Sequence, residues 1–182
     1  VGELGWELHH PIEMQNYIFD QVMEAGAEFD IKPFGIRAMD SMRLEKSYRL
    51  IPREMSIEYS AYESGLDRFV RLDKENDFIG KEALTDWQER GAVNGFVTME
   101  VIDVVDADAR GSEAIYKDGM VVGRGTSGGY GWRCGKSLAL GIVRKDLTAV
   151  GTELEIEILG EKYKSIVIDE SPFDPNNQCL RS

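Results

Sequence analysis

The first half of the chain carries apolar residues at helical spacing. Over 12–25, apolar positions recur every three or four residues, while acidic side chains occupy other positions. This spacing predicts an amphipathic helix that ends at Gly26. Further helices are predicted over 34–44, with Pro33 near the first turn, and over 80–90. The apolar stripe of the first helix consists of Met14, Ile18, Val22 and Ala25.

After Ala92 the spacing of the apolar residues changes to the alternation that is typical of strands with one buried face. An Asp-Gly turn at 118–119 predicts a hairpin, and Gly160 predicts a turn between two later strands. In that later hairpin, Glu and Lys would share the solvent face, where cross-strand pairs add some stability. The predicted strands lie at 97–101, 114–116, 120–122, 154–158 and after Gly160. We therefore expect an α+β protein with one part over 1–92 and an antiparallel β unit over 93–182.

Three shorter segments complete this prediction. Short strands are predicted at 6–9 and 69–72. The glycine-rich segment 123–132 is predicted to be an irregular connection between strands, because glycine permits unusual backbone angles. It lacks the Gly-Lys-Ser/Thr ending of a P-loop and does not open a helix, which argues against a loop that binds nucleotide phosphates.

The charge balance narrows the classes of partner. The chain has 33 acidic and 21 basic residues, with a net charge of −12. Such a chain is unsuited to nucleic acid, because neutralising phosphates requires clustered Lys and Arg. No apolar run approaches the roughly 20 residues of a transmembrane helix, and no targeting signature is visible. We therefore expect no nucleic-acid or membrane partner and a cytoplasmic location.

The sequence offers no metal-ligand or nucleophile set. Cys134 and Cys179 are too far apart for a metal-binding spacing, and His9 and His10 are too few for a histidine site. No Ser-His-Asp or Cys-His set can be assembled. We therefore predict no metal site and no catalytic residue within this chain.

The chain opens on a dense motif, VGELGWE over residues 1–7, instead of on a start methionine. This opening predicts a sequence that starts mid-protein. Glu7 is expected at the mouth of a strand, after a large aromatic residue. An ionised carboxylate there suits a ligand with paired N–H donors, such as a pterin edge, because it accepts two parallel hydrogen bonds. An ordinary surface glutamate is the alternative, and the residues alone leave both interpretations open.

Two other groups of side chains have both a structural and a binding interpretation. Asp40 lies three residues from Arg37 and three from Arg43, so ion pairs are expected along that helix. In the binding interpretation, one of these arginines instead meets an anionic group. Tyr130 and Trp132 either stack on a flat ligand or pack beneath the glycine-rich segment.

Five strings in order resemble the glycine-cleavage T-protein (aminomethyltransferase) family. They are GELGWEL at 2–8, DSMRLEK at 40–46, FIGKEAL at 78–84, GTSG at 125–128 and KSLALG at 136–141. The resemblance covers essentially the whole chain, which corresponds to the C-terminal half of a family member. It implies that 1–92 ends a folate-binding aminomethyltransferase domain and that 93–182 forms a C-terminal antiparallel β-barrel-like domain.

The resemblance implies transfer of a methylene or methyl group from a small amine or sulfonium donor to tetrahydrofolate. The glutamate that binds the pterin ring in this family corresponds to Glu7. The second domain closes over the folate in the family, which makes Arg124, Tyr130 and Trp132 candidates for folate contact beside Arg37. The catalytic Asp of the family lies upstream of this chain, so we expect the chain alone to be inactive.

One departure indicates the branch of the family. Glycine-cleavage members carry a folate-binding Arg where this chain has Met39, and Arg37 lies about 200° away around a helix. Flavin-linked members, similar to dimethylglycine and sarcosine dehydrogenases, also lack that Arg, and the run at 174–176 resembles theirs. The cysteine-containing string of an iron–sulfur-assembly branch is not matched at 46–48. The implied partners are a lipoyl carrier protein or a fused or separate flavin dehydrogenase, with FAD only if a dehydrogenase domain precedes Val1.

We therefore predict folate-dependent aminomethyl or methyl transfer from a donor such as glycine, sarcosine or dimethylglycine. One alternative is S-methyl demethylation of a sulfonium donor within the same family. Another is a folate-binding or regulatory module without chemistry of its own.

Overall fold

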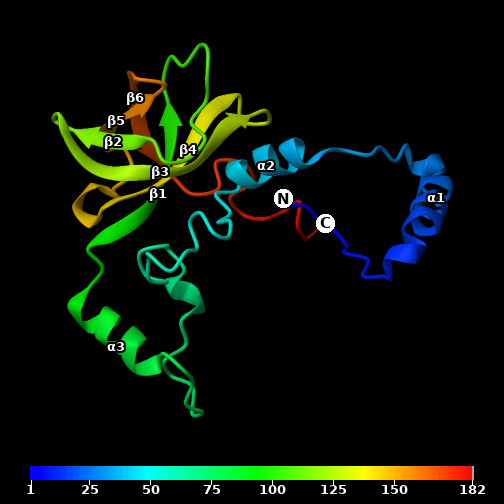
Figure 1. Ribbon diagram of the computed structural model, residues 1–182, viewed down its shortest axis with the longest axis horizontal. Coiled ribbons are helices and arrows are strands. Elements are labelled where there is room, and N and C mark those ends of the chain that lie inside the picture. The colour runs from blue at the N-terminus through cyan, green and yellow to red at the C-terminus, as the bar shows by residue number, and fades with distance from the viewer. Residues whose placement is uncertain (182) are drawn as a thin grey trace.

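The second half of the chain folds into a closed antiparallel barrel (Figure 1). In the computed structural model, which describes residues 1–181, the strand order is β1-β4-β3-β2-β5-β6, and β6 pairs back onto β1. The strands are β1 Asn94–Val101, β2 Ala114–Lys117, β3 Met120–Gly131, β4 Lys136–Arg144, β5 Glu153–Ile158 and β6 Glu161–Ile168. The expected α+β fold with an antiparallel barrel is confirmed, and closure leaves none of these strands as a free sheet edge.

The helices of the first half agree with their sequence prediction in place and length. They are α1 Gln15–Ala25, preceded by the 3-10 turn η1 Ile12–Met14, then α2 Ile36–Glu45 and α3 Lys81–Arg90. Shorter 3-10 turns are η2 Ala27–Phe29, η3 Asp67–Phe69 and η4 Lys145–Leu147. Gly26 caps the C-terminal end of α1, as its position predicts. No helix formed by the described residues, 1–181, has both the length and the apolarity to cross a membrane.

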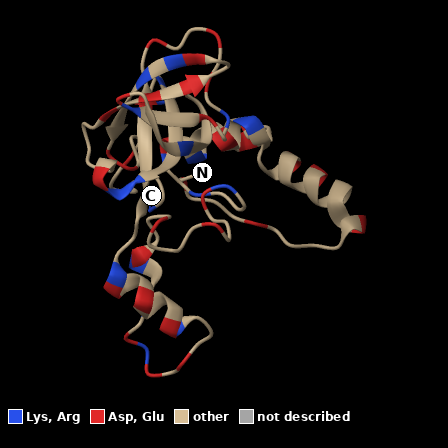
Figure 2. Ribbon diagram, turned by 60° about the vertical axis from the view of Figure 1, so that its left-hand side comes forward, with Lys and Arg blue, Asp and Glu red and all other residues tan. Residues whose placement is uncertain are grey.

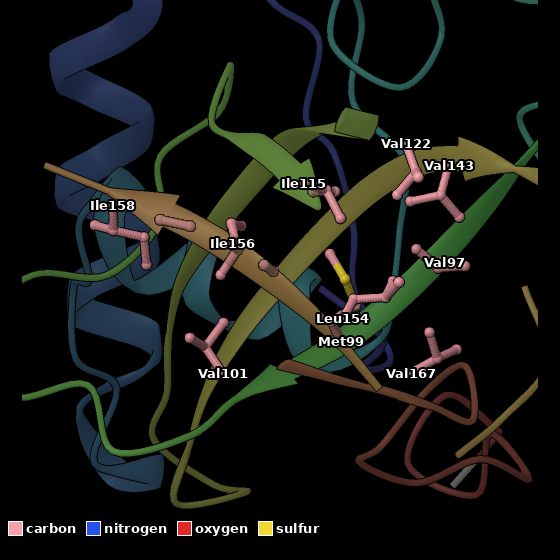
Figure 3. Packing of buried hydrophobic residues seen from close by; sticks show 12 residues of the cluster. Val97, Met99, Val101, Ile115, Val122, Val143, Leu154, Ile156, Ile158 and Val167 are labelled. Carbon is pink, nitrogen blue, oxygen red and sulfur yellow. The ribbon is translucent and has the colours of Figure 1, made fainter. Parts of the chain in front are cut away.

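The barrel core consists of apolar side chains that alternate along the strands (Figure 3). In β1, Val97, Met99 and Val101 join this core, and burying side chains of this size stabilises a fold by about 1.5–3 kcal/mol each. The outer face of β1 is buried as well, because Leu44 of α2 packs with Phe96 in a second apolar cluster. The barrel therefore has one covered flank, and the last turn of α2 lies on it.

Both predicted hairpins form. β2 and β3 pair around the Asp118-Gly119 turn, and β5 and β6 pair around Gly160. In the second hairpin Lys164 lies opposite Glu155 and forms an ion pair of 2.6 Å with Glu153. The shared Glu and Lys face expected from the sequence is therefore confirmed.

The prediction of an irregular connection at 123–132 is wrong. Most of this glycine-rich segment belongs to β3, which pairs with β4 along its length and has one register shift between Gly125 and Ser127. The glycines serve close packing: a Cβ built on Gly128 would lie 2.5 Å from the carbonyl oxygen of Ala109. Where another backbone segment lies this close to a strand, the strand needs glycine, which has no side chain.

The strands predicted at 6–9 and 69–72 are also wrong. Residues 6–9 are extended but unpaired, and residue 69 ends η3. The physical reason lies in the barrel, whose closed ring of strands offers no edge to which a further strand can bond.

Helix α1 stands away from the barrel, at the end of an extended segment (Figure 1). None of its side chains is buried, so the apolar stripe predicted for this helix faces solvent. It carries no Lys or Arg and shows only tan and red in Figure 2. The first 35 residues therefore form an arm, and its helical part lies away from the barrel.

Candidate functional site

The last turn of α2 is a buried junction of charged side chains. Arg43, Glu45 and Lys46 are all buried, although such residues are seldom buried without partners. They tolerate burial because each charge has a partner in another segment. The junction therefore joins the opening motif, the barrel and the C-terminal segment around one helix end.

Arg133, in the turn between β3 and β4, holds the opening motif in place. Its Nη1 forms an ion pair with Glu3, and its Nε donates to Glu45 Oε2 over 2.6 Å. Its backbone N–H also donates to Glu45 Oε1 over 2.5 Å, and its guanidinium lies 3.8 Å from the ring centroid of Phe173. Burial disfavours the charge on Arg133, yet the two carboxylates outweigh it and raise the pKa of the guanidinium. The motif is thus clamped at Glu3 by the barrel.

Lys46 forms the second attachment. Its side chain is fully buried, and Nζ donates to the carbonyl oxygen of Asp174 over 2.5 Å, with the Asp174 carboxylate 3.8 Å away. Gly2 packs directly on the Lys46 stem, where an added Cβ would lie 2.5 Å from Cγ. Leu4 N–H donates to the carbonyl of Cys179 over 3.2 Å. Residues 2–4 are therefore fixed between α2 and the C-terminal segment, whose end lies beside the N-terminus in Figure 1.

Arg43 and Glu54 form the third part of the junction. Arg43 Nε donates to Asp40 over 2.6 Å, which confirms one of the two ion pairs expected along this helix. Arg43 Nη1 lies 3.6 Å from Glu54, a side chain with 0% exposure. Glu54 also accepts hydrogen bonds from the hydroxyls of Thr126 (2.6 Å) and Ser127 (2.5 Å). These bonds fix β3 to the segment after α2.

Two of the five predicted binding residues lie on the arm and in the first turn of α2. Glu7 lies beyond the clamped residues, and its side chain is 88% exposed. Among the described residues its ion-pair partner is His9, at 3.5 Å, so no Lys or Arg occupies its carboxylate. Arg37 is exposed in the first turn of α2 and forms no ion pair within residues 1–181, so the expected pair with Asp40 is absent.

Of the other three predicted residues, Arg124 and Tyr130 lie in β3 and Trp132 lies in the turn after it. Tyr130 and Trp132 contact each other edge to face, with ring centroids 5.0 Å apart, and Ser41 of α2 donates to the Tyr130 carbonyl over 2.7 Å. Arg124, near the start of the strand, pairs with Glu58. The structure therefore places the five residues in three separate regions: the arm, the α2 flank of the barrel, and the start of β3.

Two features of the described residues bear on metal and nucleophile chemistry: the potential metal-ligating side chains and the Cys134 thiol. Within residues 1–181 no cluster of three or more His, Cys, Asp or Glu is arranged to hold a metal ion. Burial is the main cause that raises the pKa of the Cys134 thiol, and the nearby Glu45 carboxylate adds to it. A raised pKa leaves less thiolate at neutral pH, which disfavours a nucleophilic role for Cys134.

Sequence reasoning missed the residues that hold the motif. Glu3, Glu45 and Arg133 join positions up to 130 residues apart, and no spacing rule connects such charges. The one available signal was that Glu3 and Glu45 lie within two of the strings that resemble the family, at 2–8 and 40–46.

Two family models match successive parts of the chain. The GCVT N-terminal domain matches residues 1–74, and the glycine cleavage T-protein C-terminal barrel domain matches residues 94–174. The chain belongs to the glycine-cleavage T-protein family. The closed barrel over 94–168 is the structural counterpart of the second match.

Curated relatives of this T-protein family member fall into two groups. Human mitochondrial dimethylglycine dehydrogenase is 41% identical over 93% of this chain, which spans 20% of the length of that protein. The aminomethyltransferase of Desulfitobacterium hafniense is 32% identical over 92% of this chain, which spans 45% of it. The higher identity to the dehydrogenase agrees with the branch indicated by Met39.

A solved structure supports the fold. The crystal structure of glycine cleavage system aminomethyltransferase T from Bartonella henselae superposes with a TM-score of 0.81 over 90% of this chain and 45% of that chain, at 21% identity. The T-protein family member described here therefore spans less than half the length of each of these three proteins.

Proposed function

We propose that this chain takes part in transferring a one-carbon unit from a small amine to tetrahydrofolate, with Glu7 orienting the pterin ring. The observation that carries the proposal is the state of the opening motif. Its first residues are clamped through Glu3 and Arg133, while the Glu7 carboxylate is exposed and unpaired with any Lys or Arg of residues 1–181. A carboxylate in this state is available to a ligand.

The chemistry of the two groups fits. The pterin edge presents adjacent N–H donors, and an ionised carboxylate accepts two parallel hydrogen bonds from such an edge. Folate would supply the one-carbon chemistry, and the protein would supply binding and orientation. The 41% identity to a dimethylglycine dehydrogenase supports an N-methyl amine as the donor in preference to a sulfonium compound.

FAD enters this proposal only through a dehydrogenase unit outside these residues. Most of the glycine-rich segment 123–132 lies in β3, and it is paired to β4 instead of opening a helix. It therefore does not fit the pyrophosphate of a dinucleotide, which typically sits at a helix N-terminus.

Replacing Glu7 with Gln tests the proposal. The amide keeps the shape of the side chain but offers one acceptor oxygen and no charge, so we expect folate affinity to fall about tenfold or more. The measurement is calorimetric titration of the full-length protein with 5-formyltetrahydrofolate. Glu13→Gln, an exposed change on the same arm, is the matched control and should leave the affinity unchanged. Equal affinities for the wild type and Glu7→Gln would refute the proposed role.

A second candidate function is a folate-binding module without catalysis. It is favoured by the state of Cys134, because the raised pKa of its thiol disfavours a nucleophilic role. The two candidates differ in turnover: a full-length protein that binds folate but converts no amine or sulfonium donor would support the module.

A further inference from the structure

A small pocket of about 290 Å³ opens beside the start of β3. Its walls come from three segments that are distant in sequence: residues 52–53 after α2, the 110–112 loop before β2, and residues 124–126 of β3. Each segment contributes one arginine, so Arg53, Arg110 and Arg124 face a common space. This grouping is unusual in a chain with a net charge of −12.

Two of the three guanidinium groups are not neutralised by a carboxylate. The Arg110 side chain forms no hydrogen bond or ion pair within residues 1–181. Arg53 donates one N–H to the Arg110 carbonyl over 2.9 Å, which leaves its charge uncompensated. Arg124 is paired with Glu58, which does not line the pocket. The pocket thus presents unused N–H donors and net positive charge to solvent.

The Glu113 carboxylate lies beside the 110–112 loop and is hydrogen bonded to its backbone. Glu113 accepts hydrogen bonds from the backbone N–H of Arg110 (2.6 Å) and from that of Gly111 (2.8 Å). Two backbone donors hold it against the loop, so its role is to fix the loop backbone.

The floor of the pocket is rigid. Ser112 N–H donates to the Gly125 carbonyl over 2.7 Å, and Gly125 N–H donates to the Glu113 carbonyl over 2.7 Å. Gly111 has a φ of 125° and packs so closely that an added Cβ would lie 2.5 Å from the Thr126 carbonyl oxygen. Positive groups on a fixed backbone bind a ligand with little loss of conformational freedom, which favours affinity.

We propose that the pocket formed by Arg53, Arg110 and Arg124 binds a carboxylate group. Guanidinium groups match carboxylates because their planar N–H pairs meet both oxygens at once. The volume suits a carboxylate-bearing chain and is small for a complete drug-sized ligand. Two sources share this chemistry: the glutamyl end of folate and the carboxylate of a small amino-acid donor. Naming these two ligands rests on the proposed function. The existence of a carboxylate-binding pocket does not.

The test separates the pocket from the pterin site by using probes that lack a pterin. Calorimetry on the full-length protein would measure γ-glutamylglutamate, dimethylglycine and the pteroate analogue of 5-formyltetrahydrofolate, which lacks glutamate. The variants are Arg110→Ala and the double variant Arg53→Ala/Arg110→Ala. Arg71→Ala is the control, because Arg71 is exposed and pairs with Asp73 in a distant loop.

We expect γ-glutamylglutamate to bind the wild type and the control equally, and to bind Arg110→Ala about tenfold more weakly. The double variant should lose measurable binding, while affinity for the pteroate analogue stays the same in all variants. A loss confined to dimethylglycine would assign the pocket to the donor, within the same proposal. If the variants bind γ-glutamylglutamate and dimethylglycine as tightly as the wild type does, the inference about the pocket is wrong. This holds even if binding of the pteroate analogue supports the folate function. Loss of γ-glutamylglutamate binding in a protein that does not bind pteroate would uphold the pocket and reject the folate function.

Discussion

Arg133 shows how single residues decide the position of the candidate site. Its side chain meets the carboxylates of Glu3 and Glu45 and the ring of Phe173, which come from three different parts of the chain. Glu45 is 1% exposed, so its charge depends on these donors. A buried carboxylate that loses its cation is strongly destabilising, because the remaining charge is poorly solvated.

Replacing Arg133 with Ala should therefore lower the free energy of unfolding by about 2–3 kcal/mol, somewhat less than for a fully orphaned charge, because Glu45 keeps its backbone donors. Arg71→Ala, which removes an exposed pair with Asp73, should cost less than about 1 kcal/mol. Urea denaturation of both variants measures the difference. A loss for Arg133→Ala no larger than that of the control would contradict the clamp.

Among single residues, the sequence predicted contacts only between positions that are close together in the chain. The Asp40 and Arg43 pair followed from their spacing on one helix, and the structure contains it. The pair between Arg133 and Glu3 depends on how the barrel meets the arm, which no local rule encodes. Binding roles for Glu7, Arg37, Arg124, Tyr130 and Trp132 stay predictions, and the structure does not bring these residues together.

At the scale of elements, β3 connects the barrel to α2 and to the arginine pocket. It pairs with β2 and β4, accepts a hydrogen bond from Ser41 of α2, and lines the arginine pocket with residues 124–126. Alternating apolar residues predicted β1, β2, β5 and β6, because one face of each is buried in the barrel. The sequence analysis did not predict β4, whose residues 137–143 are all buried and therefore show no alternation. The first residues of β3, 120–122, were predicted. The rest of β3 was not, because its glycines carry no side-chain pattern and because glycine locally favours a turn.

Gly128→Ala tests whether these glycines serve packing. Its Cβ would lie 2.5–2.7 Å from backbone and side-chain atoms of Ala109, so we expect a loss of about 1–3 kcal/mol in stability. Gly35→Ala is the control, because nothing lies within 4 Å of its added Cβ and its φ of −93° is ordinary. Chemical denaturation of the two variants gives the comparison. Equal stabilities would show that β3 tolerates a side chain at this position.

For the whole molecule, the main connection between the two halves is the end of α2. The C-terminal segment wraps this end: Phe173 N–H donates to the Glu45 carbonyl over 3.1 Å, and Ser171 Oγ donates to the Lys46 carbonyl over 3.0 Å. Asp174 completes the wrap by accepting hydrogen bonds from the backbone N–H groups of residues 178 and 179, at 2.8 and 3.0 Å. The sequence predicted both halves but not this connection, because the segment after 168 has no periodic pattern.

This connection should weaken in acid. The backbone N–H of Gln178 is the main cause that lowers the pKa of Asp174, and Cys179 N–H and Lys46 add to it. A carboxyl with a lowered folded-state pKa contributes stability above its unfolded pKa of about 4, and this contribution disappears as pH falls through the folded value. Asp174→Asn should therefore lower the melting temperature at pH 7, with the difference from the wild type shrinking below about pH 4. Asp118→Asn, in an exposed turn, is the control, and its melting temperature should not differ from that of the wild type in this pH-dependent way. If the difference between Asp174→Asn and the wild type is the same at every pH, the Asp174 carboxylate does not cause the loss of stability in acid.

Helix α1 has a consequence for any partner that binds the arm. It has 11 residues and no buried side chain, and isolated helices of this length are marginal in water. The helical form of the arm is then only part of its population. A partner that recognises the helix binds with an apparent dissociation constant equal to the intrinsic constant divided by the helical fraction. Substitutions that raise helix propensity on the exposed side of α1 would tighten such binding without touching the partner.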